Sequence, residues 1–327
     1  MNNWQILWVL CAIWASFLSS CKHEPIEPPV VVLPVVEPCV DYDSLLNECI
    51  VGPFYNDLSP SYYFPTINPN NPNEFAYYTD KKVYKYNMDT KTSTLLAEDI
   101  WVISRMDWGA QGWIAFSTIN WKVWILKDDG TELKQLTFGS RDLGPIFLDD
   151  GAWLVYSETE PIETSQIIKL DVNAIGVDSF CRIEGWCSWD YCSYNAQKEE
   201  FAAPRNGVAL YNKDGVELKR TFIAGTDVAD IPDIEWLPDN ENILFITRYG
   251  NNQGTIYRVN SVTDELTMVK EGCENRFYND LAISPDGTFI LAQKGTAVVE
   301  DCDVNTTWQI VKMDLDGNNE EVIDLSE

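Results

Sequence analysis

Residues 123–137 have the sequence VWILKDDGTELKQLT, and this stretch decides the fold. A mostly apolar run is followed by Asp-Asp-Gly and then by a second run that alternates in character. Asp-Gly between two such runs is a strong signal for a β-hairpin, because glycine adopts the positive φ that a tight turn requires. The stretch is therefore predicted to form two antiparallel strands.

The same hairpin recurs along the chain at intervals of about 40 to 54 residues. Its first strand is expected at 83–87, 123–127, 167–171, 208–212, 256–260 and 310–314. A second hairpin precedes most copies, clearly at 236–243 and 283–290 and more weakly at 108–112 and 147–151. Two hairpins make a four-stranded antiparallel blade, and six blades in a ring make a β-propeller. The sequence thus predicts an all-β, six-bladed β-propeller, with a β-sandwich as the alternative.

Ser284-Pro285-Asp286-Gly287, followed by MDLDG at 313–317, resembles the Pro-Asp (WD40-like) repeat of TolB-type β-propellers. The resemblance covers residues from about 60 to 326 and is weakest in the fourth unit. TolB-like proteins recognise envelope partners, notably a peptidoglycan-associated lipoprotein, so the resemblance implies protein binding through a propeller face. The chain has no room for the amino-terminal α/β domain that those proteins carry.

The beginning of the chain predicts a lipid anchor. An apolar run at 6–17 is too short to span a bilayer and fits a secretory signal. It ends in Leu18-Ser19-Ser20-Cys21, which resembles the lipobox of bacterial lipoproteins. We expect a signal peptide at 1–20, an acylated Cys21 with a proline-rich polyproline II tether at 21–42, and the propeller at 43–327. The expected location is the cell envelope, at either face of the outer membrane.

Composition excludes several functions. The formal charge of −28, from 51 acidic and 23 basic residues, repels phosphate backbones and argues against nucleic-acid binding. The only histidine, His23, lies in the predicted tether, so catalysis or metal binding through imidazole is excluded from the propeller. No cofactor and no metal are predicted. The acidic loop at 314–321 lacks the ligand spacing of an EF-hand and is expected to be a turn.

Seven of the nine cysteines remain once Cys11 leaves with the signal and Cys21 is acylated. Export to an oxidising compartment favours disulfides. Spacing alone does not fix the pairing, and an odd number leaves at least one thiol over. The candidate bridges are Cys39–Cys49, Cys273–Cys302 and one pair among Cys181, Cys187 and Cys192.

Two sets of residues are candidates for ligand or partner binding. The segment 185–194 contains Trp186, Trp189, Tyr191 and Tyr194, which would form either an aromatic platform for a sugar or partner, or simply the aromatic strands of one blade. Arginines near strand ends would meet acidic ligands at the channel mouth, and these are Arg105, Arg141, Arg248 and Arg276. The tryptophans of the second unit are expected in the core, at positions 101, 108, 113, 121 and 124.

We therefore expect a non-enzymatic binding or scaffold lipoprotein that acts through a propeller face. The alternative is a surface lipoprotein that binds or processes carbohydrate, and an enzyme of this kind would need carboxylate, tyrosine or arginine chemistry. A third possibility is an accessory module that docks beside a separate enzyme. Fold alone does not choose among these functions.

Overall fold

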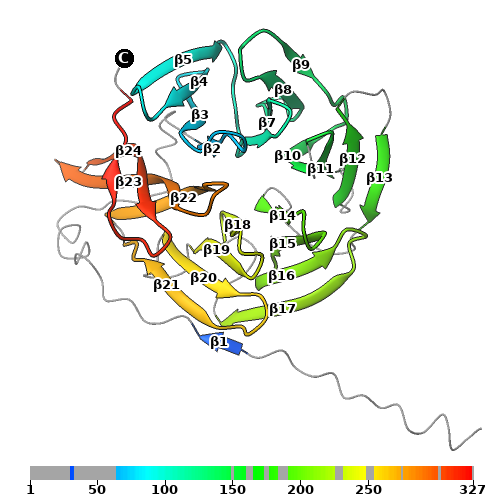
Figure 1. Cartoon of the computed structure of the whole chain (residues 1–327), viewed down its shortest axis with the longest axis vertical. Helices are drawn as coiled ribbons and strands as arrows, with labels where there is room; N and C mark the ends of the chain where they lie inside the picture. Colours follow the sequence, from blue (N-terminus) through cyan, green and yellow to red (C-terminus); the bar gives the residue numbers. More distant parts are fainter. Residues whose placement is uncertain are drawn as a thin grey trace, which may run out of the picture.

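The computed structural model describes residues 30–32, 64–148, 151–159, 165–172, 177–182, 191–224, 231–247, 254–273, 275–300 and 303–325. Within these ranges the chain forms six sheets arranged as the blades of a ring (Figure 1). Each blade contains four antiparallel strands that are consecutive in sequence. The predicted six-bladed β-propeller is confirmed.

Blades I to III follow the sequence order without interruption. Blade I contains β2 (Thr66–Ile67), β3 (Glu74–Thr79), β4 (Lys82–Asn87) and β5 (Thr92–Ala97). Blade II contains β6 (Asp107–Gly109), β7 (Trp113–Ser117), β8 (Val123–Lys127) and β9 (Leu133–Gln135). Blade III contains β10 (Asp142–Leu148), β11 (Trp153–Thr159), β12 (Ser165–Asp171) and β13 (Val177–Arg182).

Blades IV to VI complete the ring. Blade IV contains β14 (Ser193–Asn195), β15 (Glu200–Pro204), β16 (Gly207–Asn212) and β17 (Glu217–Ala224). Blade V contains β18 (Ile234–Trp236), β19 (Asn242–Thr247), β20 (Thr255–Asn260) and β21 (Leu266–Lys270). Blade VI contains β22 (Arg276–Ile283), β23 (Phe289–Glu300), β24 (Asp303–Asp314) and β25 (Glu321–Val322). The six repeats found in the sequence correspond to the third strand of each blade.

Hydrophobic side chains hold the blades together, because each blade is buried on both faces. In β7, Ile114 and Phe116 pack against blade I, whereas Trp113 and Ala115 pack against blade III. This division follows from the two-residue period of a strand. Six clusters of this kind fill the six spaces between neighbouring blades.

Packing also closes the ring between the last blade and the first. Phe75 and Tyr84 of blade I lie in one cluster with Leu291 and Ile310 of blade VI. The described strands of these blades come from two separate segments, so no strand is shared between them. Within the described part of the chain, apolar contact therefore joins the last blade to the first.

A short strand from the predicted tether lies on the outer edge of blade IV. This strand, β1 (Val30–Val32), pairs in parallel with β17, with Val30 opposite Phe222 and Val32 opposite Ala224 (Figure 1). Three valines favour a strand, and the prolines that flank them restrict it to an edge. At these residues the chain pairs with a blade, whereas polyproline II was expected.

The tryptophans of blade II divide into two groups. Trp108 and Trp113 are buried as predicted, and Trp124 is partly buried. The prediction was wrong for Trp101 and Trp121, which are 45% and 40% exposed. Both lie outside the named strands, so the alternation that buries strand residues does not apply to them.

The acidic loop at 314–321 is a turn, as expected. Gly317 there has φ +75°, and the Asp314 carboxylate accepts hydrogen bonds from the main-chain N–H groups of Asp316 and Asn318. Among the residues that the structure describes, no helix is long and apolar enough to cross a membrane.

Candidate functional site

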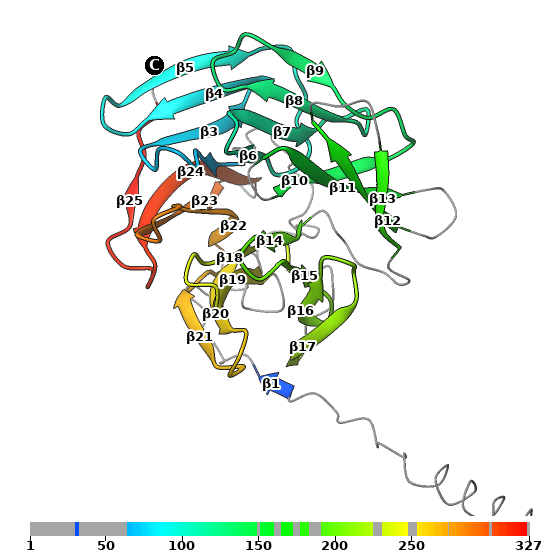
Figure 2. The same cartoon turned by 45° about the vertical axis from the view of Figure 1, so that its right-hand side comes forward.

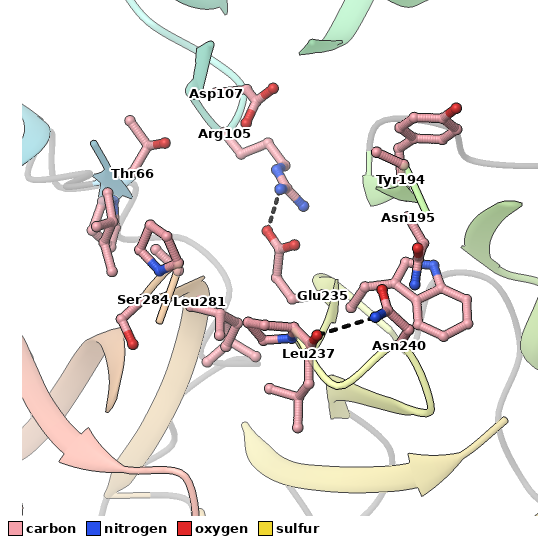
Figure 3. A pocket seen from close by; sticks show the side chains of 18 of the residues that line it. Thr66, Arg105, Asp107, Tyr194, Asn195, Glu235, Leu237, Asn240, Leu281 and Ser284 are labelled. Carbon is pink, nitrogen blue, oxygen red and sulfur yellow. Dashed lines mark hydrogen bonds and ion pairs between the residues drawn. The ribbon is translucent and has the colours of Figure 1, made fainter. Parts of the chain in front are cut away.

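A cavity of about 400 Å³ lies among the innermost strands of five blades. Its walls come from β2, β6, β14, β18 and β22 and from the turns that follow them (Figure 3). Because these strands belong to segments far apart in the sequence, only the closed ring assembles the site. This is the position at which propellers commonly present binding residues.

Arg105 is the central charged residue of the cavity. It lies two residues before β6, is 8% exposed, and points across the ring toward blade V (Figure 3). Its guanidinium donates hydrogen bonds to Asp233 Oδ1 at 3.0 Å and to Glu235 Oε1. It also reaches the main-chain carbonyl of Ile234 at 3.3 Å. The guanidinium thus ties blade II to blade V.

The two carboxylates on blade V are themselves held in place. Asp233 Oδ2 accepts a hydrogen bond from the Leu281 N–H at 2.6 Å, and this links blade V to blade VI. Glu235 Oε2 accepts one from the Ser193 hydroxyl at 2.8 Å, which links blade V to blade IV. Four of the blades therefore meet in one polar network at the ring centre.

Two more carboxyl groups lie close to this network. Asp107 Oδ2 accepts a hydrogen bond from the Phe147 N–H at 2.6 Å. Asp280 is 8% exposed and lies near enough to Asp233 to raise its pKa. Among the described residues, the Arg105 guanidinium contacts Asp233 and Glu235, while Asp107 and Asp280 lie close by.

Burial dominates the electrostatics of the network. It raises the pKa of Asp233 and of Glu235 to about 7, and Arg105 opposes the change only in part. It also raises the pKa of Asp107. Burial by itself would lower the pKa of Arg105, but Glu235 and Asp233 raise it above its ordinary value, so the guanidinium stays charged. The carboxyl groups of this network therefore give up their protons at a higher pH than exposed carboxyl groups do.

The rest of the cavity wall combines amides with aromatic rings. Tyr194 packs against Phe201 with ring centroids 4.8 Å apart. The Asn240 side chain donates hydrogen bonds to Gln197 Oε1 and to the Pro238 carbonyl. Amides of this kind offer both donors and acceptors to a polypeptide or another polar ligand.

The predicted binding residues fall into three groups. Arg105 and Tyr194 line the cavity, although the acidic partners of Arg105 come from its own chain. Tyr191 and Arg276 are half-buried and are not among the residues that line it, and Arg141 is exposed, with its guanidinium 4.4 Å from the Trp121 ring centroid. Trp186, Trp189 and Arg248 lie outside the described residues.

The predicted disulfides are largely outside the described part of the chain. Cys192 and Cys273 are buried, and no disulfide joins cysteines within the described ranges. The main chain of Cys181 belongs to β13. Cys21, Cys39, Cys49, Cys187 and Cys302 lie outside those ranges.

Sequence reasoning missed Asp107, Asp233, Glu235 and Asp280, although the repeat contains a signal for them. Arg105, Asp233 and Asp280 each stand seven residues before the positive-φ residue in the turn after the inner strand of their blade, which is Gly112, Asn240 and Gly287 respectively. Equivalent positions in a ring face the same axis. Aligning the repeats on these three residues would have brought the charged groups together.

A second, smaller pocket of about 300 Å³ lies at blades I and II. It is lined by the exposed Trp101, by Trp124 and by the polar side chains of Glu98, Asp99 and Asn120. The Lys81 ammonium lies 4.5 Å from the Trp101 ring centroid. Aromatic faces beside carboxylates and amides are suited to sugar hydroxyls and ring carbons.

Comparison with solved structures supports the fold assignment. A putative TolB from Agrobacterium tumefaciens aligns with a TM-score of 0.58 and 14% identity, over 74% of this chain and 88% of that chain. TolB from Acinetobacter baumannii aligns with a TM-score of 0.56 and 16% identity, over 85% of this chain and 65% of that chain. An oligogalacturonate lyase from Vibrio parahaemolyticus aligns with a TM-score of 0.52 and 12% identity, over 80% and 77% of the two chains.

No protein-family model and no curated protein matches the chain in sequence. The structural similarity shows that the chain has a TolB-like six-bladed propeller fold. Proteins whose names indicate different roles share this architecture, so the fold does not fix the function.

Proposed function

We propose that this chain is an envelope lipoprotein, anchored through Cys21, that binds a protein partner at the cavity in its ring centre and catalyses no reaction. The observation that carries the proposal is the cavity itself, where five blades converge on Arg105, Asp107 and Glu235. Among the described residues that line the cavity, the carboxyl groups of Asp107 and Glu235 outnumber the single guanidinium of Arg105. Such a site favours a cationic group from outside.

The expected partner presents a lysine or arginine side chain on an exposed loop or terminus. Its positive group would displace the proton held near Glu235 and form an ion pair in a site largely shielded from water. The amides of Asn195 and Asn240 would contact the neighbouring main chain. The overall charge of −28 would speed the encounter with a basic surface.

The envelope location rests on the amino-terminal signal and on the resemblance to TolB-like proteins. Acylation at Cys21 would hold the propeller at the outer membrane, and the residues between Cys21 and β1 would span the gap. Incorporation of labelled fatty acid that is lost with Cys21→Ser would support the anchor. Labelling that persists in the variant would rule it out.

The partner is tested by affinity capture from solubilised native envelope after brief crosslinking, with the Cys21→Ser chain as bait. We expect one envelope protein to be captured in stoichiometric amount, and Glu235→Gln to reduce its recovery by about tenfold, which corresponds to about 1.4 kcal/mol. The matched control is Asp129→Asn, which removes a carboxylate from an exposed turn.

Each outcome of the capture experiment has a clear meaning. Equal capture by the wild-type chain and Glu235→Gln would show that the partner binds elsewhere. If no protein is enriched above a bait with scrambled surface charge, the hypothesis of a protein partner is wrong.

A second candidate function is carbohydrate binding, which the Trp101 pocket favours. A glycan panel would be compared for the wild-type chain, Trp101→Ala and Trp121→Ala. Trp121 is the matched control because it is also exposed but does not line the pocket. Binding lost only with Trp101→Ala would support this function. The same panel with Trp186→Ala and Trp189→Ala would test the aromatic segment predicted from the sequence.

A further inference from the structure

Four exposed apolar side chains lie on neighbouring loops of blades I and II, which stand side by side across the ring from β1 (Figure 2). The loops are the links between β5 and β6, between β7 and β8, and between β9 and β10. Successive antiparallel strands alternate in direction, so these links lie at the opposite end of the blades from the turns that follow the innermost strands. We call the four side chains the apolar row, and they are Trp101, Ile119, Trp121 and Phe138.

The apolar row is strongly exposed to solvent. Phe138 is 80% exposed and Ile119 is 57% exposed, and the two tryptophans are also open to solvent. Among the side chains that the structure describes, every exposed tryptophan and phenylalanine belongs to this row. Single exposed apolar residues are common on protein surfaces, but a group of neighbouring ones marks an interaction surface.

Hydrogen bonds join the loops that carry the apolar row. The Ile119 N–H donates to the Trp101 carbonyl at 3.0 Å, which ties the first loop to the second. The Lys122 ammonium donates to the Gly139 carbonyl, which ties the second loop to the loop of Phe138. The row therefore forms one continuous surface across two blades.

Charged groups of both signs flank the apolar row. The Lys81 ammonium and the Arg141 guanidinium each lie over one of its tryptophan rings, 4.5 and 4.4 Å from the ring centroids. Glu98 and Asp99 are exposed and line the pocket beside the same row. The surface thus carries acids and bases side by side.

The net charge of these two blades differs from that of the rest of the chain. Residues 64–141 contain seven lysines and two arginines against six aspartates and three glutamates, so their formal net charge is zero. The whole formal charge of −28 therefore lies elsewhere. Two copies of so acidic a chain repel each other, and they meet with least repulsion at the neutral blades. A strongly basic partner would instead be drawn to the acidic blades.

We propose that the apolar row is the contact surface between two copies of this chain. In a contact with two-fold symmetry the same patch of each copy meets the other. A neutral patch with both signs places the acids of one copy near the bases of the other, whereas a patch of one sign would repel itself. Aromatic side chains and arginine are also enriched at protein interfaces. This surface is separate from the cavity proposed for the partner, and neither proposal depends on the other.

The test is the oligomeric state of the Cys21→Ser chain, measured by sedimentation velocity over a series of protein concentrations. Each series is run at ionic strengths of about 0.15 M and about 1 M. We expect a reversible equilibrium between monomer and dimer. The dimer fraction should be larger at the higher ionic strength, because salt screens the repulsion between two chains of charge −28 while the apolar contact remains.

Three variants separate this contact from general stickiness. Phe138→Ser removes the most exposed ring, and Trp121→Asn removes a tryptophan at φ +60°, which asparagine tolerates. Each should raise the dissociation constant of the dimer at least about tenfold. Val216→Ser is the matched control, because Val216 is 58% exposed but lies on blade IV, and it should leave the equilibrium unchanged. All three variants should melt close to the wild-type temperature, since the side chains are exposed.

A chain that stays monomeric at every concentration and at both ionic strengths would overturn the proposal. So would a dimer that Val216→Ser weakens as much as Phe138→Ser does. A third outcome is that no dimer forms, but the Cys21→Ser chain binds phospholipid vesicles and Phe138→Ser abolishes that binding. The apolar row would then dock on a membrane, and the proposal would be wrong.

Discussion

Replacing Arg105 with methionine tests the central ion-pair network directly. Methionine keeps an unbranched apolar stem but removes the guanidinium, so Asp233 and Glu235 lose their cation. Asp233 is 1% exposed and cannot turn to water. Removing one partner of a buried ion pair costs about 3–5 kcal/mol, and we expect this loss in the free energy of unfolding at pH 8.

The loss should become smaller in acid. The pKa of Asp233 and of Glu235 is already about 7 in the folded chain, above the ordinary value, and loss of Arg105 raises it further. The folded state then binds more protons than the unfolded state, so stability falls as pH rises. At pH 5 the carboxyl groups are neutral, and we expect a loss of about 1–2 kcal/mol.

Urea unfolding followed by tryptophan fluorescence at pH 5, 6, 7 and 8 measures these differences. Arg141→Met is the control because its exposed guanidinium pairs with a ring at the surface, and it should cost less than about 1 kcal/mol at every pH. Adding Glu235→Gln to Arg105→Met should restore part of the stability at pH 8. An equal loss for Arg105→Met at pH 5 and pH 8 would refute the reasoning.

Three further predictions concern the scaffold. The wild-type chain should lose stability as pH rises from about 4 to 7, because the pKa of Asp233 and of Glu235 is raised, and Asp233→Asn should flatten this part of a pH series of melting temperatures. Glu320→Gln should lower the free energy of unfolding by about 1–2 kcal/mol above pH 4.5, and by progressively less toward pH 2. The reason is that Lys294, Tyr278 and Lys270 hold the pKa of Glu320 at about 2 despite its burial. An equal loss at pH 2 would contradict this prediction. Gly317→Ala should lower the melting temperature far more than Gly287→Ala, although both glycines have φ near +70°. A Cβ at Gly317 would lie 2.2 Å from the Val269 carbonyl oxygen, whereas one at Gly287 would come no closer than 3.6 Å to Pro238. Similar shifts in the two variants would show that the backbone yields at Gly317.

The fold could be predicted from sequence because its determinants are local. Each blade needs strands with an alternating pattern and turn residues between them, and these signals lie within a few residues of one another. The turn at Asp286-Gly287 is one example. The polar network could not be predicted in the same way. Arg105 and its partners Asp233 and Glu235 are 128 and 130 residues apart in sequence. Only ring closure, which depends on packing between blades VI and I, brings them together.

The two exposed tryptophans show a second limit of sequence reasoning. Counting Trp101 and Trp121 as core assumed that they lie on strands, yet Trp121 has φ +60° in the turn between β7 and β8. Aromatic content thus indicates a core only where strand periodicity continues through the residue. Outside the strands the same side chains can remain exposed, as Trp101 does beside its pocket.

The distribution of charge inside the propeller connects stability with binding. A buried carboxyl group with a raised pKa destabilises the folded chain at neutral pH, and a chain selected for stability alone would replace it with an apolar residue. Glu235 and Asp107 instead line a cavity, where the basic group of the proposed partner would reach them. If the proposed partner binds there, the free energy lost in holding these carboxyl groups in the unbound chain would be recovered when its cation arrives. Stabilising substitutions at Glu235 should therefore weaken binding, and this opposite sign distinguishes a binding site from a structural ion pair.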